Sequence, residues 1–156
     1  MSEPPPEAVV DPTEARRLVA AGYDGVATRY RDWTAPHDTT RAWFVDEIAA
    51  RVPPGSDVVE LGMGSGGRVT QALVDRYGYV GIDGSRAQVT LARQRFPDGD
   101  FRVADLVTVE LADGSCDAVI AAYVMAHVPI ADRKNVFRRI SCWLRPTGWL
   151  CAAFPT

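Results

Sequence analysis

The chain has 156 residues, of which 47% are hydrophobic and 24% charged, and its formal net charge at pH 7 is −3. This length and balance are typical of a single globular domain with enough apolar material for a core. An acidic chain without a basic patch disfavours nucleic acid and anionic membranes as partners. No apolar run reaches the roughly 20 residues that a membrane-spanning helix needs.

The first residues lack the features of a targeting signal. Residues 1–7 are acidic and rich in proline, whereas a signal peptide begins with basic and then apolar residues. We therefore expect a cytoplasmic protein. The three cysteines are odd in number and lack metal-site spacing, so we expect them to be small core residues. All basic residues except Lys134 are arginine, which indicates a GC-rich bacterial genome.

The first third of the chain carries helical patterns after a short leader. Residues 1–10 are too polar and too rich in proline to pack, so we expect a flexible leader. The first helix is predicted over residues 11–33, with a capping aspartate at its start and a break near Gly22. A second helix is predicted to begin at Thr39 or Thr40, because its apolar positions recur at helical spacing.

From residue 53 onward, short apolar runs alternate with helical patterns. This alternation predicts an α/β fold with a parallel sheet and right-handed crossovers. Ser85 and Gln88 have the spacing of a capping box at the start of one of these helices. The predicted strands are 58–61, 79–82, 101–103, 118–124 and 149–154, and the predicted helices are 68–77, 85–96 and 132–144.

A glycine-rich turn follows the first predicted strand. Gly62, Gly64 and Gly67 satisfy the pattern G-x-G-x-x-G. Glycines at such a turn let the backbone bend tightly and approach a ligand. By itself this motif leaves open a dinucleotide-binding site, as in a nicotinamide-dependent oxidoreductase.

Three acidic residues near this turn favour a different ligand. Glu60 lies within the strand before the turn, where its carboxylate can receive a ligand ammonium. Asp83 ends the second strand, where a carboxylate can accept hydrogen bonds from both hydroxyls of a ribose. Asp105 follows the third strand and can accept a hydrogen bond from an adenine amino group. A ligand with an ammonium, a ribose diol and an adenine, but without a pyrophosphate, is S-adenosylmethionine.

Together these features resemble the class I S-adenosylmethionine-dependent methyltransferase family. The resemblance runs from about Tyr23 to Phe154 and rests on five segments that follow one another in the family's order. Tyr23-Asp24-x-x-Ala27-x-x-Tyr30 is also similar to the N-terminal helix of the family's small-molecule, quinone-biosynthesis-like members. The five segments are residues 58–66, 80–85, 105–106, 117–128 and 144–150.

The resemblance implies a methyltransferase with S-adenosylmethionine as cofactor and a small molecule as methyl acceptor. It also implies a Rossmann-like, doubly wound parallel sheet with a strand order like 3-2-1-4-5. The chain then consists of a flexible leader (1–10), an N-terminal helical lid (11–52) and a cofactor-binding core (53–156). The residues expected to bind the cofactor are Glu60, Gly62, Met63, Gly64, Gly66, Asp83, Gly84, Ala104, Asp105, Leu106, Tyr123 and Tyr30.

The sequence departs from the family's pattern at its end. The family's sheet usually has two further strands that shape part of the substrate pocket, whereas this sequence stops at Thr156, just after the fifth strand. An exposed edge on that strand favours pairing with another chain, so we expect a homodimer through it. The same departure keeps open an alternative function, a non-catalytic S-adenosylmethionine-binding homologue or subunit whose site another chain completes.

Three residues are candidates for the chemistry: His127, His37 and Tyr23. Methyl transfer chiefly requires alignment of the acceptor, and a general base is needed only for a hydroxyl or a protonated amine. His127 follows the fourth strand at the ligand-binding edge and can act as that base or pack beneath the strand end. His37 lies in a loop that can close over the cofactor or stay in solvent. Tyr23 shares a helical face with Tyr30, where the pair can line the methyl site or form a packed stripe. No metal site is expected.

Overall fold

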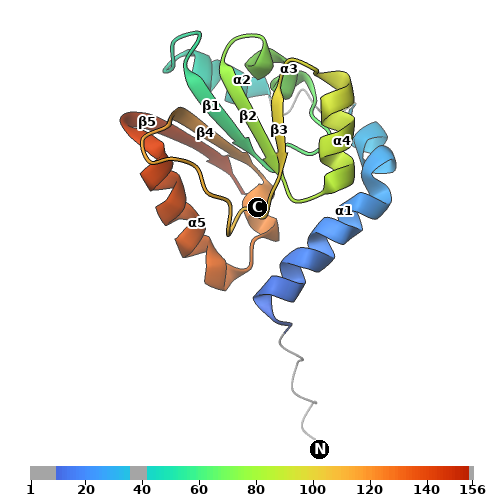
Figure 1. The fold of residues 1–156 in the computed structure, drawn as a ribbon. Helices are drawn as coiled ribbons and strands as arrows, with labels where there is room; N and C mark the ends of the chain where they lie inside the picture. The colour runs from blue at the N-terminus through green and yellow to red at the C-terminus, as the bar shows by residue number, and fades with distance from the viewer. Residues whose placement is uncertain (1–9, 36–41, 155–156) are drawn as a thin grey trace, which may run out of the picture.

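Helices and strands alternate along the chain from the first strand onward. The computed structural model describes residues 10–35 and 42–154 (Figure 1). The helices are α1 (Pro12–Thr34), α2 (Ala42–Ala49), α3 (Arg68–Val74), α4 (Arg86–Arg95) and α5 (Ile130–Trp143), with a short 3₁₀ helix η2 (Val124–His127). The strands are β1 (Asp57–Leu61), β2 (Gly78–Asp83), β3 (Asp100–Val103), β4 (Cys116–Ala122) and β5 (Leu144–Ala153).

The strands form one parallel sheet with the order β3-β2-β1-β4-β5, which confirms the predicted Rossmann-like fold. β1 is central, and its Val58 pairs with Tyr79 of β2 on one side and Ala118 of β4 on the other. Open sheets of this kind bind ligands at the carboxyl ends of their strands, where the strand order reverses. Figure 1 shows these ends pointing down, toward α1.

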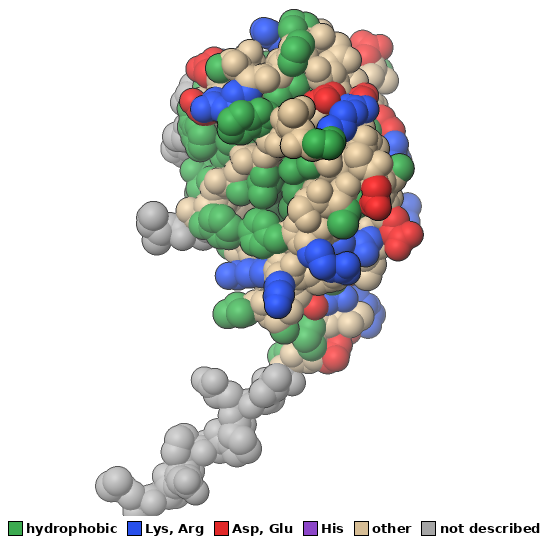
Figure 2. Space-filling model, turned by 90° about the vertical axis from the view of Figure 1, so that its left-hand side faces the viewer, with side chains coloured by type: hydrophobic (Ala, Val, Ile, Leu, Met, Phe, Trp, Pro, Cys, Tyr) green, Lys and Arg blue, Asp and Glu red, His purple; other side chains and the backbone are tan. Residues whose placement is uncertain are grey.

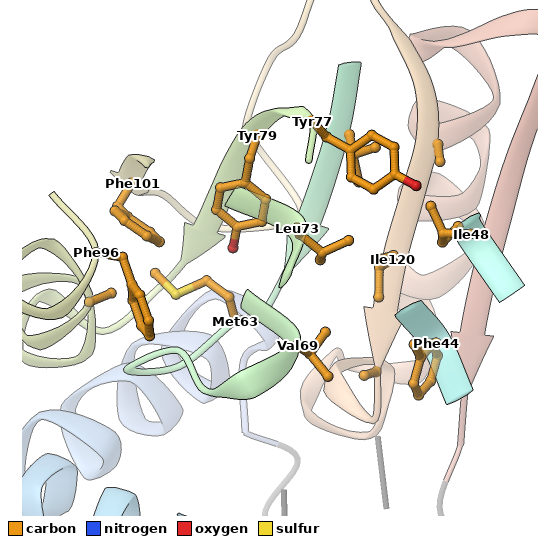
Figure 3. Close-up of a cluster of buried hydrophobic side chains, with 14 of the residues drawn as sticks. Phe44, Ile48, Met63, Val69, Leu73, Tyr77, Tyr79, Phe96, Phe101 and Ile120 are labelled. Atoms are coloured by element: carbon orange, nitrogen blue, oxygen red, sulfur yellow. The ribbon is translucent and has the colours of Figure 1, made fainter. Parts of the chain in front are cut away.

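Helices cover the two faces of the sheet and bury two apolar clusters. On one face α2, α3 and α4 contribute to a cluster that includes Val58 and Ile120 (Figure 3). On the other face α5 contributes to a cluster that includes Val59 and Val119. Because successive side chains of a strand alternate between faces, Glu60 lies on the same face as Val58. A carboxylate is thereby placed at the rim of an apolar layer.

The two N-terminal helices occupy different places. Phe44 and Ile48 bury α2 in the first cluster, so this helix is a layer of the core. α1 instead lies along α4 and lines the cavity described below (Figure 1). The division into a lid over residues 11–52 and a core from residue 53 remains a prediction, and Thr39 and Thr40 lie outside the described residues. Within the described ranges, no helix combines the length and apolar character that a membrane span requires.

The predicted break near Gly22 is wrong, because α1 is continuous from Pro12 to Thr34. No heavy atom lies within 4 Å of a β-carbon placed on Gly22, so this glycine faces open space. A glycine inside a helix costs about 1 kcal/mol. That cost is small beside the side-chain contacts that fasten α1 to the core on both sides of Gly22.

The end of the described chain also differs from prediction. β5 begins at Leu144, and residues 145–148, which lie between the predicted helix 132–144 and the predicted strand 149–154, form an irregular part of the β4–β5 ladder. Cys116 pairs with Leu144 but Ala118 pairs with Trp149, so β5 carries extra residues between these two pairs.

One strand and one helix end earlier than predicted, and one cysteine that was predicted to be buried is exposed. β4 ends at Ala122 and α3 at Val74. Cys116 is buried as expected, whereas Cys142 is exposed. The reason is that α5 turns its neighbour Trp143, rather than Cys142, toward the sheet.

β5 is an edge strand of the described sheet, and apolar side chains gather on it. Trp149 and Leu150 are exposed on β5, and Phe154 is exposed just after it. Figure 2 views the molecule from the side of β5 and shows apolar side chains grouped on that surface. An edge of this kind can pair with another chain. The expected homodimer remains a prediction.

The loop between β1 and α3 depends on glycines in the left-handed region. Gly62, Gly64 and Gly66 have φ angles of 65°, 62° and 69°. A β-carbon on Gly62 would lie 2.2 Å from Cγ2 of Val124. The amide of Gly62 donates to the carbonyl oxygen of Ile82 at 2.7 Å, so the turn cannot move away from the sheet without losing this hydrogen bond.

Gly62→Ala is expected to destabilise the fold by about 2–4 kcal/mol, because it adds a clash with Val124 to the strain of a left-handed alanine. Gly114→Ala is the matched control, since Gly114 has a φ of 60° and nothing within 4 Å of an added β-carbon. We expect this control to lose about 1 kcal/mol from backbone strain alone. Urea unfolding measures both values, and equal losses would contradict the role given to Val124.

Candidate functional site

A cavity of about 950 Å³ lies at the carboxyl ends of the strands. Its walls are formed by the glycine loop, the segments that follow β2 and β3, η2 and α1. This volume is within the range of small-molecule sites. Ala104 does not line the cavity, and His37 lies outside the described residues. The expected site residues that do line it are Tyr23, Tyr30, Glu60, Gly62, Met63, Gly64, Gly66, Asp83, Gly84, Asp105, Leu106, Tyr123 and His127.

The Asp83 carboxylate joins the loops that follow β1 and β2. Its Oδ2 accepts a hydrogen bond from the amide of Gly64 at 2.9 Å, and its Oδ1 accepts one from the amide of Ser85 at 2.8 Å. Burial raises the pKa of Asp83, and the two amide donors oppose this rise. Each carboxylate oxygen can accept more than one hydrogen bond. Asp83 can therefore hold the glycine loop and still accept hydroxyl groups from a ligand.

Glu60 places a second carboxylate beneath the glycine loop, at 5% exposure. Its Oε2 accepts hydrogen bonds from the hydroxyls of Tyr79 at 2.7 Å and Thr70 at 3.1 Å. Gly81, which pairs with Glu60 across the sheet, leaves the space that the Tyr79 hydroxyl occupies. Burial and the nearby Glu60 carboxylate raise the pKa of Tyr79 well above its usual value. The Tyr79 hydroxyl therefore stays protonated and orients Glu60.

An arginine of α1 fastens this helix to the rim of the cavity. Nε of Arg16 lies 2.8 Å from Oδ2 of Asp105, and Nη1 lies 2.5 Å from Oδ2 of Asp132. Oδ1 of Asp105 accepts a hydrogen bond from the amide of Val107 at 2.9 Å. Both oxygens of Asp105 thus carry a hydrogen bond within the chain. Its expected contact with an adenine amino group remains a prediction.

Asp24 forms a second attachment between α1 and the core. Its Oδ1 accepts hydrogen bonds from the Ser85 hydroxyl at 2.6 Å and from the amide of Ala87 at 2.9 Å. The hydrogen bond from Ser85 lowers the pKa of Asp24, and the amide of Ala87 lowers it further. Ser85 is thereby held by two carboxylates, its amide by Asp83 and its hydroxyl by Asp24. α1 is thus linked through one residue to the acid at the end of β2.

Aromatic side chains line the part of the cavity next to α1. The Tyr23 hydroxyl lies 3.1 Å from Nε2 of His127, and the two rings meet edge to face with centroids 5.4 Å apart. Tyr30 packs edge to face on Tyr23 at 5.1 Å, and Trp33 continues the row at 6.1 Å from Tyr30. The structure therefore brings two of the candidate catalytic residues, Tyr23 and His127, into direct contact.

Tyr123 connects β4 to η2, which carries His127, through an unusual backbone conformation. It is the only described residue other than glycine with a positive φ, 64°. Its amide donates to the carbonyl oxygen of Ala153 at 3.0 Å, so the turn is anchored to the last residue of the neighbouring strand β5. Left-handed residues other than glycine often mark functional sites, where surrounding structure holds the strain.

Sequence reasoning did not assign several of the cavity-lining residues to the site, among them Arg16, Gln88 and Arg95. Nη1 of Arg95 donates to the carbonyl oxygen of Gly66 at 2.6 Å and supports the glycine loop from the last turn of α4. Gln88 is buried on the same helix. The two residues are seven positions apart and so share a helical face, and this spacing could have predicted from the sequence that they lie on the same side of α4. Across the described part of the chain, no three His, Cys, Asp or Glu side chains are grouped to hold a metal ion.

This parallel sheet, with a glycine loop after its central strand and an acid at the end of the next strand, defines a Rossmann-like ligand-binding domain. The sequence profile of a family described as "Methyltransferase domain" matches residues 59–152, more than half of the chain. The chain belongs to the class I S-adenosylmethionine-dependent methyltransferase family.

Known proteins of several kinds are similar to this chain. Trans-aconitate 2-methyltransferase of Variovorax paradoxus is 33% identical over 124 residues, which cover 76% of this chain and 47% of that protein. The tRNA (carboxymethyluridine(34)-5-O)-methyltransferase ALKBH8 of Macaca fascicularis is 32% identical over 94% of this chain and 22% of its own length. The chain therefore spans less than half the length of these relatives.

A solved structure supports the same fold. Phosphoethanolamine N-methyltransferase 1 of Haemonchus contortus, in complex with phosphoethanolamine and S-adenosylhomocysteine, superposes with a TM-score of 0.72. The match covers 89% of this chain and 31% of that one, at 17% sequence identity. This similarity concerns the fold alone.

Proposed function

We propose that the chain binds S-adenosylmethionine in the cavity and transfers its methyl group to a small-molecule acceptor. The observation that carries this proposal is the convergence of the glycine loop, Asp83 and Glu60 on one cavity of about 950 Å³. Family membership supports the cofactor, and the name of the trans-aconitate relative supports a small acceptor.

The donor set of the cavity suits this cofactor. Asp83 can accept hydrogen bonds from ribose hydroxyls, and the buried carboxylate of Glu60 offers negative charge to an ammonium, directly or through water. Gly64 has open space where a β-carbon would stand, apart from the Gln88 amide oxygen at 3.9 Å, so a ligand can lie against the backbone. When bound, S-adenosylmethionine supplies an electrophilic methyl group on its sulfonium.

The acceptor is expected to lie beside the aromatic row of α1. Tyr23, Tyr30 and Trp33 can exclude water and orient an acceptor against the cofactor. The contact between the Tyr23 hydroxyl and Nε2 of His127 favours His127 as a general base, since Tyr23 can fix the imidazole ring in one orientation. A base is needed if the accepting atom belongs to a hydroxyl or a protonated amine.

Affinity for S-adenosylhomocysteine is expected to depend on the charge of Asp83. Burial raises the pKa of Asp83 above that of an ordinary aspartate, and the ionised carboxylate is the better acceptor for ribose hydroxyls. Binding should therefore be full at neutral pH and weaken as the pH falls through this raised pKa. Asp83→Asn should weaken binding by about tenfold or more at neutral pH, and the affinity of this variant should no longer fall as the pH is lowered.

Calorimetric titration between pH 7 and about pH 4 measures this dependence. Asp98→Asn, a change at an exposed aspartate, is the matched control and should behave as the wild type. An affinity that does not change with pH, or an unaffected Asp83→Asn variant, would contradict the ribose-binding role. Tighter binding of a nicotinamide dinucleotide than of S-adenosylhomocysteine would favour the oxidoreductase alternative.

Transfer itself can be followed with S-adenosylmethionine that carries a deuterated methyl group. We expect the purified chain to label a compound in a bacterial extract filtered below 1 kDa, with release of S-adenosylhomocysteine. His127→Ala should lower the rate by about 100-fold without changing the affinity for S-adenosylhomocysteine. Tyr23→Phe should lower it less, and Asp98→Asn, at an exposed residue that does not line the cavity, serves as the control. Mass spectrometry of the filtrate detects the product.

A parallel incubation with total tRNA tests the acceptor class. Label in tRNA alone would show that the small-molecule assignment is wrong. Bound cofactor without label in either fraction would instead support the non-catalytic alternative, in which another chain completes the site.

A further inference from the structure

The side-chain amide of Gln88 is buried beside the cavity and has no hydrogen-bond partner among the described residues. The residue is 1% exposed, and among the described residues neither its Oε1 nor its Nε2 has a partner. Buried polar atoms of this kind are uncommon, because leaving one unpaired destabilises the fold. An unpaired amide that borders a ligand cavity is therefore a candidate for a role in the bound state.

The start of α4 does not need this amide. In a capping box, the side chain of Gln88 would accept a hydrogen bond from the amide of Ser85. Here that amide donates to Oδ1 of Asp83 at 2.8 Å instead. The amide of Ala87 donates to Asp24 at 2.9 Å, and the amide of Gln88 donates to the Ser85 hydroxyl at 3.2 Å. The capping box that the sequence predicts thus forms only in part, and the side chain of Gln88 takes no part in it.

Gln88 and Asp83 approach the same point of the glycine loop. Oδ2 of Asp83 lies 2.9 Å from the amide nitrogen of Gly64. Oε1 of Gln88 lies 3.9 Å from an ideal β-carbon built on Gly64, and no other heavy atom lies within 4 Å of that position. Asp83, Gly64 and Gln88 all line the cavity. The Gln88 side chain therefore borders the part of the cavity where Asp83 and Gly64 meet.

We propose that Gln88 binds a ribose hydroxyl of the cofactor next to Asp83. The ionised carboxylate can only accept hydrogen bonds, whereas a primary amide both donates and accepts. A vicinal diol offers two hydroxyls, each a donor and an acceptor, so a carboxylate and an amide together can satisfy both. Gln88 is thus a specificity residue for the diol. This inference rests on the proposed function.

Gln88→Met separates this role from a structural one. Methionine has a similar length and no amide, so it removes the unpaired group with little change in volume. We expect the melting temperature of the ligand-free chain to rise by about 2–4 °C. The same variant should bind S-adenosylhomocysteine about tenfold more weakly in calorimetry. Gln94→Met, an exposed change on the same helix, is the matched control and should alter neither value.

Ligand analogues identify the group that Gln88 contacts. The wild type should bind both 2′-deoxy- and 3′-deoxy-S-adenosylhomocysteine more weakly than the parent compound. Gln88→Met should bind one of these two analogues almost as well as it binds the parent compound, because the hydroxyl that this analogue lacks is the one that Gln88 contacts. If the variant does not fold, the side-chain amide signals of Gln88 in ¹⁵N NMR of the wild type give a second readout. These signals should shift when S-adenosylhomocysteine is added. They should shift less with the deoxy analogue that lacks the hydroxyl bound by Gln88.

Two results would overturn the inference, and they differ in meaning. If the wild type binds S-adenosylhomocysteine and Gln88→Met binds it equally well, Gln88 does not contact the diol while the proposed function stands. If the wild type does not bind S-adenosylhomocysteine at all, the proposed function fails and this inference fails with it.

Discussion

The carboxylate of Asp83 is the constraint on which the rest of the site depends. One of its oxygens accepts a hydrogen bond from the amide of Gly64 and the other accepts one from the amide of Ser85. These two hydrogen bonds fix the loops after β1 and β2 relative to each other. Ser85 in turn binds Asp24 of α1, which places the aromatic row over the cavity. A single acid at the end of β2 thereby organises the glycine loop, the start of α4 and the helix that covers them.

Much of this architecture could be predicted because it follows from local patterns. The continuous apolar run of β4 fits a strand buried on both faces, and the regular alternation of strands with helices fits a parallel sheet. Gly62 and Gly64 indicate a left-handed backbone conformation, which residues with a β-carbon rarely adopt. Asp83 and Glu60 line the cavity because parallel strands place their carboxyl ends at one edge, which is a property of topology rather than of detailed packing.

The remaining features could not be predicted because they depend on residues distant in sequence. Arg16 meets Asp105 across 89 positions and Asp24 meets Ser85 across 61, and no local pattern encodes such pairs. The break expected near Gly22 fails for the same reason, since these contacts fasten α1 to the core on both sides of Gly22, and the helix is continuous. The capping box at Ser85 was half correct: Ser85 caps α4, but Asp83 takes the place of Gln88. That exchange is visible only once β2 and α4 are placed together.

Hydrogen–deuterium exchange with and without S-adenosylhomocysteine tests the central claim most directly, because the amides of Gly64 and Ser85 both bind Asp83. Ligand bound in the cavity should slow exchange in peptides that contain residues 62–67 and 83–88, while peptides from the outer side of α5 should not change. The account would be contradicted if saturating ligand left these two loops unprotected, or if protection appeared only with a nicotinamide dinucleotide.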